Sequence, residues 1–164
     1  MKKLFLSFFL CVMAVVASAQ VTTSVDGKFE LCDDAGVGAG VTFAFDEHFE
    51  FAPSISVFFP GSNTTLFSLE GDVHYKLPEL ADKLDLYPIA GLGYYHWNTK
   101  YNTLVDNKPV EVKDKDNLLL VNLGFGARYH LSDQWAVFAE EKVQLVTRHY
   151  SNFLSIGISY TLDL

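Results

Sequence analysis

Eight segments of this chain alternate apolar and polar side chains with a period of two residues. In the last of them Leu154, Ile156, Ile158, Tyr160, Leu162 and Leu164 alternate with small or polar residues. Successive side chains of a strand point to opposite faces, so this period predicts strands with one apolar and one polar face. The strands are expected at 25–32, 36–45, 49–59, 65–77, 86–97, 118–131, 135–146 and 153–164.

The first 19 residues have the pattern of a secretory signal peptide. Two lysines are followed by an apolar run over 4–16 and by a small-residue cleavage site over 17–19. The apolar run is shorter than the roughly 20 residues that a membrane-spanning helix needs. We therefore expect residues 1–19 to be removed and residues 20–164 to form one domain.

The mature chain is acidic and keeps one cysteine. Loss of two N-terminal lysines leaves 10 basic against 20 acidic residues, so the net charge falls from −8 to −10. This balance argues against nucleic acid as a partner, because no excess cation neutralises phosphate. Cys32 alone excludes an intramolecular disulfide and a thiolate zinc cluster. His48, His74, His96 and His130 share no ligand spacing, so we expect neither a metal nor a cofactor.

The lengths of the connections predict an up-and-down order of eight antiparallel strands. Every second connection is a short turn, at 46–48, 78–85 and 132–134, whereas the others include the long segment 98–117. An even number of strands places both termini at the end with the short turns. Outer-membrane barrels have this layout, with short turns and both termini in the periplasm.

A soluble β-sandwich or a lipocalin-like barrel would also alternate, so the chemistry of the two faces has to decide. The polar face is rich in Gly, Ser and Thr and also carries charges of both signs. A narrow eight-stranded barrel accommodates this mixture if small residues leave space and the charges pair. A sheet in lipid also has to close. We therefore predict an all-β, eight-stranded transmembrane barrel. Its last strand, 153–164, pairs with the first and faces lipid with Leu154, Ile156, Ile158, Tyr160, Leu162 and Leu164.

Aromatic residues gather near both ends of the expected strands, as in the interfacial belts of membrane barrels. The residues expected in the belt beside the short turns are Phe49, Tyr75, Tyr87, Tyr129 and Trp135. Those expected in the belt beside the longer loops are Phe59, Trp97, Tyr101 and Phe153.

Several stretches resemble the OmpA/OmpX-like superfamily of small β-barrels, particularly the short single-domain outer-membrane barrels of Bacteroidetes. They are the signal peptide, "VGAGVTFAF", "YPIAGLGYYHW", "NLGFGARYHLSDQWAVFAE" and the terminal strand. The resemblance implies a multi-pass protein of the outer membrane that contacts lipid and lipopolysaccharide. It also implies insertion by the barrel-assembly machinery, although Leu164 stands where that family has a terminal aromatic residue.

The charged residues of the polar face are expected to form a closed ion-pair network that fills the barrel. The predicted members are Glu30, Glu70, Asp72, Lys76, Arg128 and Glu140. Arg128 is the expected hub, because its guanidinium can hold two carboxylates at once. Its expected partners are Glu140 and either Glu70 or Asp72. A solute pore is the alternative.

A second alternative concerns "RHYSN", residues 148–152, in the last outer loop. It resembles the His-x-Ser-Asn motif of the lipid A 3-O-deacylases, which are also eight-stranded outer-membrane barrels. The resemblance casts His149 as the base and Ser151 as the nucleophile, with Asn152 assisting. Glu140 or Glu141 would replace the acidic residue that orients the His. This esterase is the alternative to the function that we favour.

The long segment 98–117 mixes four lysines with four acidic residues. Val110, Val112 and the "DNKP" turn suggest a hairpin that extends the sheet beyond the membrane. An exposed strand edge can pair with a strand of another protein, so this segment is the expected contact with an extracellular partner. We therefore predict a non-catalytic barrel with a structural or adhesin-like role.

Overall fold

The computed structural model describes residues 21–32, 34–60, 64–78, 82–105, 108–146 and 149–162, and over 100–116 and 146–150 it describes the backbone alone. The expected signal peptide, 1–19, lies outside these residues. The eight strands are β1 (Thr22–Leu31), β2 (Ala35–Ala44), β3 (Phe49–Phe58), β4 (Thr64–Tyr75), β5 (Leu84–Val105), β6 (Lys108–His130), β7 (Trp135–Val146) and β8 (His149–Leu162). The described residues contain no helix that is long and apolar enough to cross a membrane.

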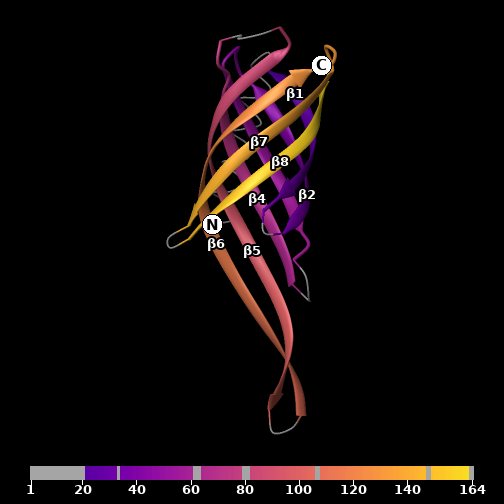
Figure 1. The fold of residues 1–164 in the computed structure, drawn as a ribbon, viewed down its shortest axis with the longest axis vertical. Coiled ribbons are helices and arrows are strands. Elements are labelled where there is room, and N and C mark those ends of the chain that lie inside the picture. The colour runs from indigo at the N-terminus through magenta and orange to yellow at the C-terminus, as the bar shows by residue number, and fades with distance from the viewer. Residues whose placement is uncertain are drawn as a thin grey trace, which may run out of the picture.

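The strands form one closed antiparallel barrel in the order β1 to β8 (Figure 1). Strand β1 pairs with β8 from Thr23↔Leu162 to Leu31↔Leu154, so the predicted closure between the last and first strands is confirmed. Of the described ladders, the one between β2 and β3 is interrupted, between Gly40↔Ser54 and Phe43↔Phe51. Pro53 lies in this gap, where a proline has no N–H to donate to the ladder.

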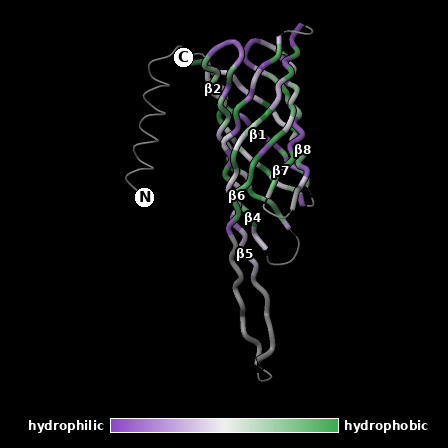
Figure 2. Tube along the Cα trace, turned by 90° about the vertical axis from the view of Figure 1, so that its left-hand side faces the viewer, coloured by the Kyte–Doolittle hydropathy of each residue, from purple (hydrophilic) through white to green (hydrophobic). Residues whose placement is uncertain are grey.

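The two faces of the wall have the polarity that the sequence predicts for a membrane barrel. Hydrophobic and hydrophilic residues alternate along the strands (Figure 2). Large apolar side chains cover the outer surface, and Phe29, Val37 and Leu123 are each nearly half exposed. Buried polar and charged side chains fill the inside. A soluble sandwich or lipocalin-like barrel would have an apolar interior, so this distribution argues against both.

Strands β5 and β6 are longer than the expected 86–97 and 118–131, because the hairpin suggested for 98–117 is present and continues both strands. Their pairing continues without a break from Leu84↔Tyr129 to Val105↔Lys108, so most of the segment 98–117 is strand. Strand β4 pairs with β5 only as far as Thr99, and β7 pairs with β6 only from Val121. The hairpin therefore projects beyond the rest of the barrel as an isolated two-stranded ribbon (Figure 1).

The predicted aromatic belts are partly correct. Phe49, Tyr75, Tyr129 and Trp135 are exposed beside the short turns, and Phe59 is exposed at the other end. Tyr87 and Phe153 were wrongly assigned to the belts, because both are buried in the barrel interior. Trp97 packs against the core cluster, and the side chain of Tyr101 lies outside the described residues.

An apolar cluster fills the barrel at the end where the long hairpin projects. Its buried members are Phe58, Leu66, Tyr95, Leu120 and Phe153. The rings pack at angles to one another, with Phe58 and Phe153 edge to face at 5.8 Å between ring centroids. We call these five residues the outer plug, because they occupy the space through which a channel would have to pass.

The turn between β2 and β3 is fixed by one carboxylate. The backbone N–H groups of Phe49 and His48 donate to Asp46 Oδ1 at 2.6 and 2.7 Å. These two bonds hold the pKa of the Asp46 carboxyl below its usual value. The Asp side chain therefore compensates backbone donors that the tight turn would otherwise leave unbonded.

Candidate functional site

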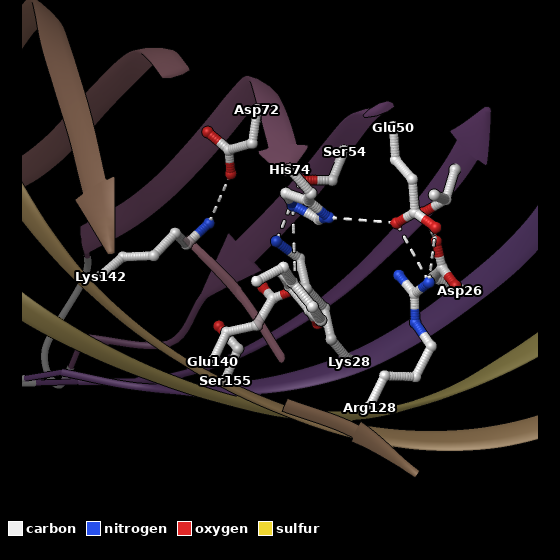
Figure 3. A network of polar contacts seen from close by, with 12 residues as sticks. Asp26, Lys28, Glu50, Ser54, Asp72, His74, Arg128, Glu140, Lys142 and Ser155 are labelled. Atoms are coloured by element: carbon white, nitrogen blue, oxygen red, sulfur yellow. Dashed lines mark hydrogen bonds and ion pairs between the residues drawn. The ribbon is translucent and has the colours of Figure 1, made fainter. Parts of the chain in front are cut away.

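Next to the outer plug, on the side of the short turns, Lys142 on β7 lies between two carboxylates of β4. Its Nζ donates to Asp72 at 3.0 Å (Figure 3) and also to Glu70. All three side chains are buried. Asn122 donates to Asp72 at 2.8 Å and to Glu70 at 3.4 Å. One ammonium and one amide therefore hold two neighbouring carboxylates together inside the barrel.

A second group of charges lies toward the short turns and centres on Glu50. Arg128 Nη1 donates to both Glu50 oxygens at 2.9 and 3.0 Å. His74 Nδ1 lies 3.6 Å from Glu50 Oε2 (Figure 3). Lys76 Nζ lies 3.6 Å from Glu50 Oε1. Arg128 on β6, His74 on β4 and Lys76, directly after β4, thus surround one buried carboxylate.

Tyr87 connects this group to β7. Its hydroxyl donates to Glu140 Oε1 at 3.0 Å, and its ring stacks on His74 at 4.7 Å between centroids. The Arg128 guanidinium lies 5.3 Å from the centroid of the same ring. This arrangement requires a glycine opposite the ring, because a Cβ on Gly126 would lie 2.3 Å from Tyr87 Cε2.

Lys28 and Glu30 on β1 form a third group of charges in the barrel interior. Lys28 Nζ lies 2.8 Å from Glu30 Oε1 and donates to Ser54 at 3.0 Å. Glu30 also accepts a hydrogen bond from Ser155 at 3.3 Å across the closing seam. The charged interior therefore bonds the first strand to the last as well as to β3.

All six predicted network residues lie inside the barrel, but the predicted partners of Arg128 were wrong. Arg128 pairs with Glu50, whereas Glu70 and Asp72 pair with Lys142. Lys142 was missed because the adjacent Glu140 and Glu141 left the register of β7 undecided. Lys142 is two residues from Glu140, so choosing the register with Glu140 inside would have identified it.

The barrel interior contains a hollow large enough for solvent at one end. A hollow of about 350 Å³ lies beside the short turns and is lined by Glu50, Lys76 and Arg128 and by the pair His130–Asp85, 2.9 Å apart. A smaller cavity of about 30 Å³, lined by Thr42, Pro53 and Arg128 among others, adjoins the gap in the β2–β3 ladder. That volume suits one or two waters.

The candidate esterase residues are not assembled as the motif requires. The loop is shorter than expected, because β8 already begins at His149, whose side chain lies outside the described residues. Ser151 pairs with Gln144, whereas Glu140 pairs with Ser155, about 13 Å away along the strand at 3.3 Å per residue. Glu140 accepts its hydrogen bond from Tyr87. Glu140 is thus not positioned to orient a histidine beside Ser151.

Comparison with known proteins identifies the fold. No protein-family model and no curated protein matches the chain. Among solved structures, the N-terminal β-barrel domain of Pseudomonas aeruginosa OprF has a TM-score of 0.67 and 16% identity, over 87% of this chain and 100% of that one. A major outer membrane protein from Thermus thermophilus has a TM-score of 0.69 and 14% identity, over 87% and 99%.

The attachment invasion locus protein Ail of Yersinia pestis is a third similar structure, with a TM-score of 0.54 and 11% identity, over 87% of this chain and 97% of that one. These likenesses confirm the prediction of a small OmpA/OmpX-like barrel at the level of the fold. The Bacteroidetes assignment stays a prediction. A shared fold does not carry a shared function.

Proposed function

We propose that this chain, which has the fold of the small outer-membrane β-barrels, is itself an integral outer-membrane protein with a structural or surface-interaction role. The observation that carries the proposal is the polarity of the closed barrel, which is apolar outside and charged inside. Such an exterior is stable in hydrocarbon, and closure leaves no strand edge exposed to lipid.

In the proposed orientation the short turns and both termini lie in the periplasm, and the β5–β6 hairpin lies outside the cell. Short periplasmic turns and longer external loops are general among barrels of this class. Outer-membrane lipid and lipopolysaccharide are the surrounding partners, and the barrel-assembly machinery inserts the chain. The outer plug and the ion pairs support a closed lumen over a solute pore.

The projecting hairpin is the proposed contact surface for an extracellular partner. Within the described residues, β5 has no second neighbour beyond Thr99, and β6 has none before Val121. The unpaired backbone groups along these edges can add a strand from another protein. Ail of Yersinia pestis was solved with the heparin analogue sucrose octasulfate, but the balanced charge of segment 98–117 favours strand pairing over binding of a polyanion.

Removing the hairpin tests both parts of the proposal. The full chain should fractionate with the outer membrane and should migrate faster on a gel when unheated than when boiled. Deletion of 101–115 should leave both properties unchanged. Strand β4 pairs with β5 as far as Thr99, and β7 pairs with β6 from Val121, so the deleted residues take no part in these two ladders. The same deletion should abolish binding to host-cell or bacterial surfaces, measured with labelled protein in bilayer nanodiscs.

The controls separate the two parts. A scrambled 101–115 of equal composition should bind poorly if strand pairing depends on sequence. Recovery of the full chain in the soluble periplasm, without heat-modifiable mobility, would refute the membrane role. Equal surface binding by the full chain and the deletion variant would refute the contact surface alone.

The proposed role includes no catalysis. Purified barrel incubated with lipid A should release no fatty acid above the background of detergent alone, since Glu140 is bonded to Tyr87 and lies far from Ser151 along the strand. Release is measured by mass spectrometry, with Ser151→Ala as the matched variant. Release by the native chain that Ser151→Ala abolishes would restore the esterase alternative.

A further inference from the structure

The two strand edges of the projecting hairpin differ in their residues. Within the described residues, β5 has no second neighbour over 100–105 and β6 has none over 108–116. We call these stretches the β5 edge and the β6 edge. The β5 edge reads "KYNTLV", with one charge and with Tyr, Thr and Val, which favour strands. The β6 edge reads "KPVEVKDKD", with six charged residues and a proline. Charges and prolines protect natural strand edges from pairing, so the β6 edge is protected and the β5 edge is not.

The register of the ladders shows which backbone groups the β5 edge presents. Successive residues of an antiparallel strand bond alternately to the neighbours on its two sides. The Leu77 N–H donates to the Leu86 carbonyl oxygen at 2.8 Å, so the even-numbered residues of β5 bond toward β4. Strand β5 keeps one register with β4 and one with β6 over the described ladders. The backbone N–H groups of Lys100, Asn102 and Leu104 therefore point away from β6, toward an added strand.

The β6 edge presents its odd-numbered residues. The His130 N–H donates to the Lys83 carbonyl oxygen, and the Leu131 N–H donates to the Trp135 carbonyl oxygen, both at 2.8 Å. Even-numbered residues of β6 thus bond toward β5, and odd-numbered residues bond toward β7 or, in the hairpin, face the β6 edge. Pro109 is one of these and has no N–H. The β6 edge therefore lacks a donor near the tip of the hairpin.

The step between β4 and the hairpin restricts what can pair with the β5 edge. Strand β4 occupies the place beside β5 as far as the pair Thr64↔Thr99, and β5 continues alone with β6 beyond it (Figure 1). An added strand would therefore lie in line with β4 and outside the barrel wall. The β5 strand of a second barrel in the same membrane is a poor occupant, because its lower part would need the place that β4 already fills. An extended segment of another protein has no such conflict.

We infer that the β5 edge accepts an extended, uncharged strand of an extracellular protein and that the β6 edge does not. The N–H groups of Lys100, Asn102 and Leu104 donate to carbonyl oxygens of the partner strand, and their carbonyl oxygens accept from its N–H groups. A partner segment rich in Thr, Val and Tyr fits best, since β-branched and aromatic residues form the stabilising cross-strand pairs. The inference rests on the contact surface proposed above and assigns it to one of its two edges.

The test places one proline on each edge at the same rung of the hairpin, where Asn102 pairs with Glu111. Asn102→Pro removes an N–H that points to the β5 edge, and Glu111→Pro removes one that points to the β6 edge, so neither removes a donor between β5 and β6. The probe is the labelled full-length barrel in bilayer nanodiscs, on the same cells as the deletion variant. Asn102→Pro should bind these cells roughly tenfold more weakly than the native barrel, because the partner loses a hydrogen bond and meets the proline ring. Glu111→Pro should bind like the native barrel.

Asn102→Thr keeps the backbone N–H and should bind like the native barrel, which separates the backbone from the side chain at this position. Equal binding by Asn102→Pro and Glu111→Pro, a loss confined to Glu111→Pro, or a loss in Asn102→Thr would overturn the inference alone. Dimers of the native barrel in nanodiscs that Asn102→Pro separates would identify a second copy as the partner and would overturn the choice of another protein. Unchanged binding after deletion of 101–115 would overturn the proposed contact surface and the inference with it.

Discussion

Lys142→Met is expected to lower the free energy of unfolding by about 3–5 kcal/mol, the usual cost of removing one partner from a buried ion pair. The Lys142 side chain is 1% exposed and holds both Glu70 and Asp72. Without the ammonium these two carboxylates are left close together in the interior, with Asn122 as a shared hydrogen-bond donor. The measurement is urea unfolding in detergent micelles, followed by tryptophan fluorescence and by gel mobility without heating.

Two further variants identify the cause of this loss. The triple variant Lys142→Met, Glu70→Gln, Asp72→Asn should recover most of the lost stability, since neutral side chains need no counter-charge. Lys76→Met removes a lysine whose side chain is 21% exposed and should cost about 1 kcal/mol or less. A Lys142→Met barrel as stable as the native one would show that water already compensates the two carboxylates.

Gly157→Ala is expected to cost about 3 kcal/mol, at the upper end of overpacking effects. A Cβ at this position would lie 2.3 Å from Phe138 Cζ and 2.5 Å from the Gly27 carbonyl oxygen. The backbone oxygen belongs to the neighbouring strand of the closing seam, so relief of the clash has to displace β1 from β8. Urea unfolding and the fraction of barrel that folds from denaturant into micelles measure the effect.

Gly27→Ala is the matched control across the same seam. A Cβ on Gly27 meets nothing within 4 Å, so this variant should be as stable as the native barrel or slightly more stable. Both variants add one methyl group to paired strands, and they differ in the face of the wall that receives it. If the two variants lose the same stability, the cause is glycine replacement in general and not the interior contact with Phe138.

The alternation of apolar and polar residues identified the strands in the barrel wall, and it failed in the part of β5 and β6 that projects beyond the wall. It placed β1 and β2 within a few residues, since each alternates over most of its length, and it placed the bounds of β7 although Glu140 and Glu141 left the register of that strand undecided. It ended β5 near Trp97, although the strand continues to Val105. A two-stranded ribbon beyond the barrel wall encloses no interior that would require one apolar and one polar face, so hydropathy carries little signal there.

The sequence predicted which charged residues lie inside the barrel but not which of them form ion pairs with one another. Alternation decides which side chains enter the barrel, and it placed Glu30, Glu70 and Arg128 inside. The partner of each charge depends on how far neighbouring strands are staggered as the sheet closes, and one sequence does not specify this shift. Glu50 and Arg128 come from strands that are not neighbours, so only the closed barrel brings them together.

The interrupted ladder between β2 and β3 has a consequence for how the wall separates and reforms. This seam has lost hydrogen bonds at Pro53, yet its two strands are joined by the short turn 45–48. The β1–β8 seam is uninterrupted and joins residues from opposite ends of the chain. The entropy lost on bringing two segments together grows with the length of chain between them. The interrupted β2–β3 ladder thus joins strands that a short turn keeps close, so these strands re-pair fastest after they separate. The continuous β1–β8 ladder joins strands that are far apart in the chain, so these strands would re-pair most slowly.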